Sequence, residues 1–454
     1  MFSHSINGLK IETMQHTLLL HVGYGKTGSS ALQSWLANNA SCLAEQGFSY
    51  AIKDKDSIQY RISSGNGGPL NGFLAGLSNA EQFKQHYFNH DLANTIISSE
   101  ILSLSPDTIS KLESFCKTNS IELKVLAYVR DLADWTYSAY VQGVKRHCSL
   151  MSYSDYIVNM KAFPHISMAK MMNGRFSDIT FVHYNTHKAD VVAPFAQWAN
   201  IREDLLIPLA NRKVNRTLTV DEIQVVQLFV SWRQSYFNDL DTFNISMLIS
   251  DWLVNDFPNK ESEVAITEKN IEQLTGKFGQ SLEAFNRSIG ESNGFALSYA
   301  DVTLVPQMKE VSVSEEVIDV HLFELVLRYV LSRPGVCDHL FRVILLIEAY
   351  KLFPQLVERL LNEERWKVLR KIAPSLGALA TLNPQQVIGL KHLFESPRYE
   401  LDSQDYLLFR DSALALENSN LDLALPLMEI ASKGRPNGKL IKDKLKQYKS
   451  RVNK

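Results

Sequence analysis

The sequence predicts an α/β fold, in which a parallel β-sheet flanked by helices is followed by an all-helical C-terminal region. Two observations support this class. Short apolar runs typical of buried strands recur in the first part of the chain, at residues 17–22, 95–98, 123–129 and 179–184, and helical patterns follow most of them. After about residue 305 these runs stop, and apolar residues recur at helical spacing.

The composition excludes several classes of protein. The chain has 454 residues, of which 45% are hydrophobic, so it is long enough for two or three domains. Its net charge of −2 provides no basic field for nucleic acid. The 4 cysteines lack metal-ligand spacing, which indicates free thiols in a reducing compartment, and no signal peptide or membrane-spanning run is visible. We therefore expect a cytoplasmic protein without nucleic-acid partners.

We expect three parts along the chain: a loose leader at residues 1–13, an α/β domain at 14–306 and a helical domain at 307–454. Helical patterns of the last part lie at residues 319–331, 339–352, 355–361, 384–394, 406–417 and 421–432. The last two have the small-residue spacing of a tetratricopeptide-type hairpin. The basic residues after position 432 fit either a solvated terminal helix or peripheral contact with the anionic inner face of a membrane.

Within the α/β domain, residues 51–93 are predicted to form a long irregular connection. Its length suits a lid or binding loop, and a flexible surface insertion explains it equally well. Further on, Ser105-Pro106-Asp107 indicates a helix start, because an N-cap hydroxyl, a first-turn proline and an acid occur together. Ligands bind at the carboxyl ends of parallel strands, so functional residues are expected directly after each run.

The first strand leads into a turn typical of a phosphate site, at residues 23–30, which we name the glycine turn. Its candidate binding residues are Gly25, Lys26, Thr27, Gly28, Ser29 and Ser30. Glycine lets the backbone approach a ligand, lysine adds a mobile charge, and the following helix offers unpaired N–H groups. The spacing differs from a Walker A loop, because the position five residues before Gly25 is Leu20 rather than glycine.

A second stretch carries an arginine at a strand end, Arg130, and a serine eight residues later, Ser138. Together with the glycine turn, it resembles the family of sulfotransferases that use 3′-phosphoadenosine 5′-phosphosulfate (PAPS). In that family a KxGTT strand-loop-helix binds the 5′-phosphosulfate, and such an arginine and serine bind the 3′-phosphate. Lys26-Thr27-Gly28-Ser29-Ser30 stands at the first motif here. The resemblance implies a P-loop-like fold, PAPS as co-substrate, 3′-phosphoadenosine 5′-phosphate (PAP) as product, and no metal.

Two further residues match the family less specifically. Tyr184, at the end of the run 179–184, stands where members carry a tyrosine that touches the adenine, although a half-buried core tyrosine explains it equally well. Arg216 lies in a polar stretch that resembles one found in bacterial members, and we expect the cations of this stretch to close over the nucleotide. Ala31 stands where many cytosolic members carry tryptophan, and their RKG-type motif is not visible. The resemblance therefore points to the bacterial, carbohydrate-modifying branch and to a glycan or glycolipid acceptor.

The chemistry implied by this resemblance assigns two catalytic roles. Sulfuryl transfer resembles phosphoryl transfer, so charge builds on the leaving phosphate oxygen, and Lys26 is expected to stabilise it. The acceptor hydroxyl needs a base within hydrogen-bond reach. Glu100, shortly after the run 95–98, is the first choice because carbohydrate-modifying members use a glutamate in a similar region. His86 and His90 are the alternatives.

Two other functions remain open. In a P-loop kinase or phosphotransferase, Asp131 would end a Walker B strand and bind magnesium. Against this, the glycine turn lacks the extra glycine, and Arg130 occupies the place of the acid. A noncatalytic nucleotide-binding protein would act through its helical domain, and a Glu100 that is solvent-exposed and far from Lys26 would favour that function. The sequence does not indicate an oligomeric state.

Overall fold

The chain divides into two compact units. The computed structural model describes residues 15–51, 55–59, 63–88, 91–100, 102, 104–209, 216–236, 242–260, 266–299, 318–333, 339–363, 380, 403–418 and 421–452. The first unit comprises Met1–Tyr140, Met151–Thr217 and Ser262–Met308, and the second comprises Val141–Leu150, Leu218–Glu261 and Lys309–Lys454. Two segments predicted to be in the α/β domain, Val141–Leu150 and Leu218–Glu261, therefore group with the C-terminal helices.

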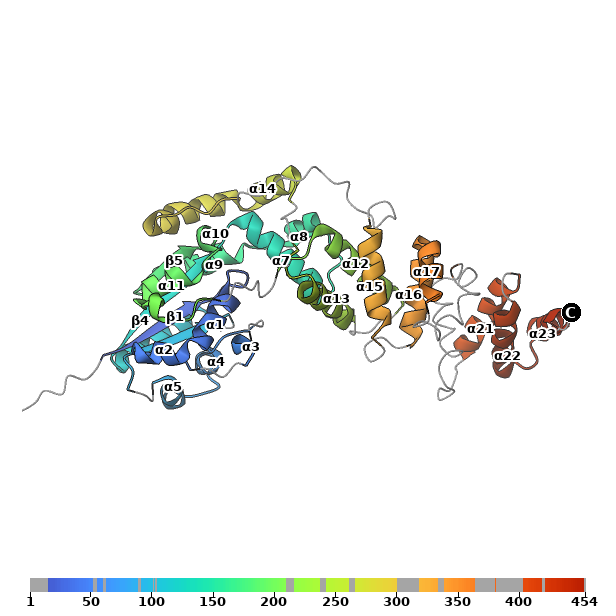
Figure 1. Cartoon of the computed structure of the whole chain (residues 1–454), viewed down its shortest axis with the longest axis horizontal. Coiled ribbons are helices and arrows are strands. Elements are labelled where there is room, and N and C mark those ends of the chain that lie inside the picture. The colour runs from blue at the N-terminus through green and yellow to red at the C-terminus, as the bar shows by residue number, and fades with distance from the viewer. Residues whose placement is uncertain are drawn as a thin grey trace, which may run out of the picture. The chain divides into compact units, whose positions relative to one another are not determined.

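The first unit is built on a five-stranded parallel sheet (Figure 1), which confirms the predicted fold class. The strands are β1 (His16–Val22), β2 (Phe48–Ser49), β3 (Asn94–Ser99), β4 (Ile121–Val129) and β5 (Ile179–His183). Their order in space is β2-β3-β1-β4-β5, with every neighbouring pair parallel. The central strand β1 therefore lies between β3 and β4, and the carboxyl ends of these three strands meet at one edge.

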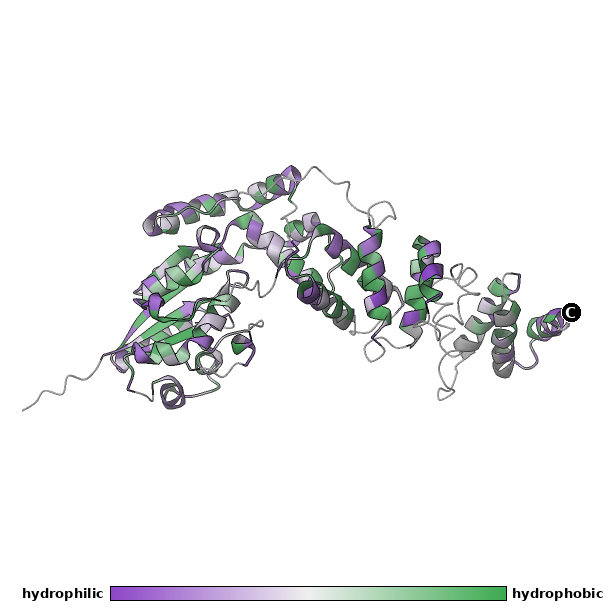
Figure 2. Cartoon of the chain, in the orientation of Figure 1, coloured by the Kyte–Doolittle hydropathy of each residue, from purple (hydrophilic) through white to green (hydrophobic). Residues whose placement is uncertain are grey.

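Helices flank this sheet. They are α1 (Ser29–Asn38), α2 (Ala40–Glu45), α3 (Lys55–Ile58), α4 (Gly68–Leu74), α5 (Ala80–Tyr87), α6 (Pro106–Thr118), α7 (Leu132–His147, which continues into the second unit), α8 (Tyr153–Asn159), α9 (Pro164–Met172), α10 (Tyr184–His187), α11 (Val192–Ala199) and α14 (Glu268–Phe285). The strands are strongly hydrophobic (Figure 2), as expected for a parallel sheet covered by helices. One core cluster joins Leu36 of α1, Ile96 of β3, Tyr128 of β4 and Phe195 of α11.

The predicted elements agree with the structure at most positions and differ at some. Ser105 caps α6 as expected, because its side chain accepts the N–H of Thr108 in a capping box. β2 was not predicted, since a strand of two residues leaves no pattern. β5 ends at His183, so Tyr184 begins α10 and does not close the strand. Residues 51–93, predicted to be irregular, contain α3, α4 and α5.

The glycine-rich middle of that segment packs against β3. Gly65 forms an antiparallel bridge with Ser99, and the N–H of Asn66 donates to the carbonyl of Ser98 at 3.1 Å. The Asn66 side chain donates to the carbonyl of Ile96 at 3.0 Å and accepts the N–H of Ser98 at 2.8 Å. β2 pairs with β3 only as far as Thr95. Residues 65–66 therefore continue the sheet along the same edge, towards the carboxyl end of β3.

The second unit is helical in its described residues, without a strand among them. Its helices are α12 (Val220–Tyr236), α13 (Thr242–Asp256), α15 (Val320–Leu331), α16 (His339–Leu352), α17 (Pro354–Leu361), α21 (Ser403–Leu416), α22 (Leu421–Gly434) and α23 (Lys439–Val452). Five of the six predicted C-terminal patterns correspond to α15, α16, α17, α21 and α22, and the pattern at 384–394 lies outside the described residues. No helix in the described part of the chain is long and apolar enough to cross a membrane.

The basic C-terminus forms α23. Its Ile441 and Tyr448 are buried, and the Tyr448 hydroxyl donates to Glu417 at 2.9 Å. Lys444 pairs with the same glutamate, which directly follows α21, and Lys449 pairs with Glu429 of α22 at 3.0 Å. Two of the basic residues therefore hold this helix against its neighbours.

Replacing Gly65 with alanine should destabilise the first unit. Gly65 has a φ of +79°, and a Cβ there would lie 1.9 Å from the carbonyl oxygen of Ser98. We expect the free energy of unfolding to fall by about 2 kcal/mol or more, measured by urea denaturation. Gly68→Ala is the matched control, because a Cβ there meets nothing within 4 Å. Equal stability of the two variants would contradict the packing of Gly65 on β3.

Candidate functional site

The glycine turn connects β1 to α1 at the centre of the sheet edge. Lys26 has a φ of +73° and Gly28, the N-cap of α1, a φ of +79°. A left-handed conformation is uncommon for a residue other than glycine and often marks a functional site. The Thr27 hydroxyl donates to the carbonyl of Tyr24 at 2.6 Å, and Ser29 and Ser30 open α1. The predicted binding residues of the turn thus form one compact bend.

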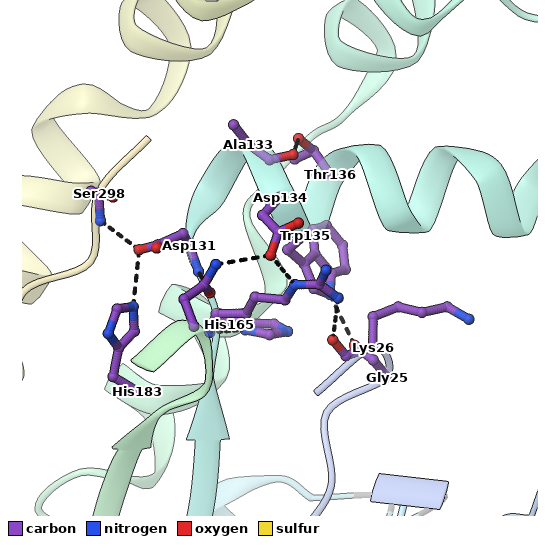
Figure 3. Close-up of polar contacts among 12 residues, drawn as sticks. Gly25, Lys26, Asp131, Ala133, Asp134, Trp135, Thr136, His165, His183 and Ser298 are labelled. Atoms are coloured by element: carbon purple, nitrogen blue, oxygen red, sulfur yellow. Dashed lines mark hydrogen bonds and ion pairs between the residues drawn. The ribbon is translucent and has the colours of Figure 1, made fainter. Parts of the chain in front are cut away.

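Two side chains that follow β4 bind the carbonyl groups of this turn (Figure 3). The indole Nε1 of Trp135 donates to the carbonyl of Gly25 at 3.0 Å, and Nη1 of Arg130 donates to the carbonyl of Lys26. In a trans peptide the C=O and the next N–H point in opposite directions, so the N–H groups of Lys26 and Thr27 point away from these donors.

The N–H groups of the turn are arranged in a way that suits an anion. Within the described residues, the N–H groups of Thr27 and Gly28 have no hydrogen-bond partner. Successive N–H groups in a bend with left-handed residues form a concave nest that binds anions, and the first turn of α1 adds the positive end of its dipole. The geometry therefore suits a phosphate or sulfate group.

Arg130 is held by four groups. Its own N–H donates to Nδ1 of His165 at 3.0 Å, and its Nε donates to Asp134 at 2.8 Å. Its guanidinium carbon lies 4.9 Å from the centre of the Tyr184 ring, and Lys26 accepts from Nη1. Burial would raise the pKa of Asp134, but the hydrogen bond and charge of Arg130 outweigh it, so this pKa is lowered. The pair therefore stays ionised at neutral pH.

These contacts place Arg130 directly at the glycine turn. Nε and Nη1 are already bonded, whereas Nη2 makes no hydrogen bond within the described part of the chain. Ser138 lies half-buried on α7, and no described hydrogen bond joins it to Arg130 or to the turn. The structure thus brings the predicted arginine to the turn, and does not link the predicted serine to either.

Tyr184 also lies at the turn. A Cβ on Gly28 would approach Cε2 of its ring to 3.2 Å, so the ring covers the start of α1. Burial raises the pKa of Tyr184, and the charge of Arg130 opposes this rise. Arg216 is buried, with 4% of its surface exposed, and donates to the carbonyl of neighbouring Thr217 at 3.1 Å. That bond does not bring Arg216 to the turn, and its expected role stays a prediction.

Glu100 follows β3 and lies beside the start of α1. A Cβ on Gly23 would lie 2.6 Å from Oγ of Ser29 and 3.1 Å from Cγ of Glu100, so the two side chains flank this glycine. Burial raises the pKa of Glu100, while a hydrogen bond with Ser29 and the charge of Lys26 oppose the rise. The residue keeps more than a third of its surface exposed, so solvent moderates this shift.

The other candidate bases lie elsewhere or cannot be placed. His86 is half-buried in the last turn of α5 and contacts the ring of Tyr87 edge-on. His90 lies outside the described residues. Glu100 is therefore the candidate base for which the structure gives a contact with the glycine turn.

Sequence reasoning missed a buried network beside this site. Asp131 accepts the N–H of Ser298 at 2.7 Å and contacts Nε2 of His183 at 3.1 Å. Its own N–H donates to Asn185, whose amide also donates to Asp134. Figure 3 shows that the Asp131 carboxylate faces His183 and Ser298 and not Lys26. The partners lie up to 167 residues apart in sequence, so no local pattern reveals them.

His165 was also missed. It is 1% exposed, packs against the rings of Tyr24 and Trp135, and accepts the N–H of Arg130. Burial, assisted by the charge of Arg130, lowers its pKa to about 3, so the ring is neutral and Nδ1 remains an acceptor. His165 thereby orients Arg130 without adding a charge.

Comparison with protein-family models, curated proteins and solved structures found no match to this chain. The described residues also contain no group of three or more His, Cys, Asp or Glu side chains that could hold a metal ion. The functional assignment therefore rests on the residues and contacts of the site.

The exchange Glu100→Gln should change the pH dependence of stability. Folding raises the pKa of Glu100 above 4.5. The native protein therefore loses stability as the pH rises from about 4.5 through the pKa of Glu100 in the folded state, because this carboxyl group ionises less readily there than in the unfolded chain. The variant should therefore gain stability relative to wild type over this rise, measured by urea denaturation at pH 4 and pH 8. Glu45→Gln, at an exposed residue of α2, controls for the loss of one charge. If the free energies of unfolding of Glu100→Gln and wild type differed by the same amount at pH 4 and pH 8, the raised pKa of Glu100 would be contradicted.

Proposed function

We propose that this protein is a PAPS-dependent sulfotransferase that transfers a sulfuryl group to a hydroxyl or amine of a glycan, glycolipid or related acceptor. The observation that carries the proposal is the hydrogen bond from Arg130 to the carbonyl of Lys26. It joins the two segments that the sequence resemblance assigns to the two anionic ends of PAPS.

The residues at this edge of the sheet suit a ligand with two anionic groups. In the proposal, the N–H groups and hydroxyls of the glycine turn bind the 5′-phosphosulfate. Nη2 of Arg130, with Ser138 further along α7, binds the 3′-phosphate. The ring of Tyr184 contacts the adenine. Arg216 is proposed, on the resemblance alone, to close over the nucleotide.

The chain supplies two groups to the transfer itself. An acceptor oxygen forms a bond to sulfur while the bond from sulfur to the phosphate oxygen breaks, and the negative charge passes to that oxygen. Lys26 of the glycine turn neutralises this charge. Glu100 takes the acceptor's proton, and its raised pKa brings it closer to neutrality, where a general base works best.

The two other functions are less well supported. The Asp131 carboxylate is bonded to Ser298 and His183, so the position expected to bind magnesium in a kinase is already used. Glu100 is exposed, as expected for a noncatalytic protein, but it lies beside Ser29 at Gly23, and the charge of Lys26 acts on its pKa, which argues against a large separation from Lys26.

The proposal includes a cytoplasmic location. The cysteines Cys42, Cys116 and Cys148 are free thiols, which suits a reducing compartment. Exposed lysines of α23, among them Lys439 and Lys446, support peripheral contact with an anionic membrane face.

A titration with PAP tests the proposed function. A ligand that binds only the folded state raises the melting temperature by mass action, so PAP without metal should stabilise the protein. ATP with magnesium should stabilise it much less, measured by thermal shift at equal ligand concentrations. A response confined to ATP with magnesium would replace this proposal with the kinase function, and no response to either would refute a nucleotide site.

Replacing Arg130 with alanine should selectively weaken recognition of the 3′-phosphate. Loss of the hydrogen bond from Arg130 to the Lys26 carbonyl should affect PAP and AMP alike. Loss of the charge-assisted hydrogen bond to the 3′-phosphate should affect only PAP, because AMP lacks that phosphate. We expect the ratio of PAP to AMP affinity, measured by calorimetry, to fall roughly tenfold. Arg175→Ala, at an exposed arginine of the same unit, is the control. An unchanged ratio would show that Arg130 does not contact the 3′-phosphate.

A further inference from the structure

The peptide between Gly25 and Lys26 has two possible orientations. In the present one, Lys26 is left-handed and the carbonyl of Gly25 points to Trp135. Rotation of this peptide by about half a turn would bring the φ of Lys26 to an ordinary negative value. It would also turn the Gly25 carbonyl towards the place that the N–H of Lys26 now faces. The rotated form is less strained locally, and it directs a carbonyl oxygen at an anion.

Packing does not hold this peptide in place. Gly25 is exposed, and a Cβ added to it would meet nothing within 4 Å. The hydrogen bond from Trp135 to the Gly25 carbonyl is therefore a contact that resists rotation, and the buried ring of His165 also lies beside the Gly25 backbone. Arg130 binds the next carbonyl, that of Lys26, which belongs to a different peptide.

The indole of Trp135 is well placed to act as a fixed donor. Its ring centre lies 5.4 Å from that of Phe163 and 5.2 Å from that of His165, which restricts its orientation. His165 is itself held by the N–H of Arg130 and packs against the ring of Tyr24, within the glycine turn. The donor is thus fixed to β4 and to the turn at the same time.

We propose that Trp135 is a positioning residue that locks the Gly25–Lys26 peptide in the orientation that presents N–H groups to an anionic ligand. Trp135 acts through the backbone and does not contact the ligand. Its loss should therefore weaken every ligand that uses the turn by the same factor. The identity of the nucleotide rests on the proposed function, whereas the lock itself does not.

The variant Trp135→Phe removes the indole N–H and keeps an aromatic ring against Phe163 and His165. Its affinities for PAP and for AMP, measured by calorimetry, should both fall about three- to tenfold, with their ratio unchanged. Its crystal structure should show the Gly25 carbonyl rotated and Lys26 at negative φ. The losses should shrink in a Lys26→Gly background, because glycine removes the strain that favours rotation.

The matched control is Trp252→Phe in α13, which also deletes an indole hydrogen bond, to Asp256, from a stacked tryptophan of the second unit. It should leave both affinities unchanged. Unaltered affinities and an unrotated peptide in Trp135→Phe would overturn the proposal, as would a loss confined to PAP. If wild type bound neither PAP nor AMP, the proposed function would fail, and the peptide orientation in the variant's crystal structure would still decide the role of Trp135.

Discussion

The site depends on one residue, Arg130, because it joins elements that the chain order separates. It follows β4, yet its side chain binds the carbonyl of Lys26 in the turn after β1 and the carboxylate of Asp134 in α7. Its backbone is fixed by His165 of α9. The parallel order that places β1 beside β4 makes this bond possible. Without that register, the turn and the arginine would present two unrelated groups instead of one surface.

The fold was predictable where local patterns decide the structure. β1 from Leu18 and β4 from Val125 are buried on both faces and are therefore largely apolar, and α6 begins at its capping box. Local sequence patterns do not predict the structure where tertiary contacts determine it. β2 is two residues long and exists only because β3 offers an edge, and the glycines near position 65 suggest mobility until their packing on β3 is seen.

The candidate site, like the fold, was predictable only where a local sequence pattern indicates it. Lys26 and Arg130 suggested anion binding and Glu100 a general base, and each follows a strand, whose ends converge in parallel sheets. Trp135 and His165 gave no such signal. An indole that binds a carbonyl 110 residues away and a neutral histidine that accepts a backbone N–H resemble core residues in any sequence pattern. They act on the backbone of the turn, which the sequence does not display.

The charges of the site explain why the backbone of the turn is so important. Lys26 and Arg130 contribute two positive charges, and Glu100 and Asp134 contribute two negative charges when ionised, so these four side chains sum to zero. Arg130 is moreover paired with Asp134, which weakens its field on any ligand. Attraction for an anion must then come largely from N–H groups and the dipole of α1. These act only if the turn keeps its left-handed bend, so small changes in backbone orientation should control binding more strongly than the loss of a distant charge.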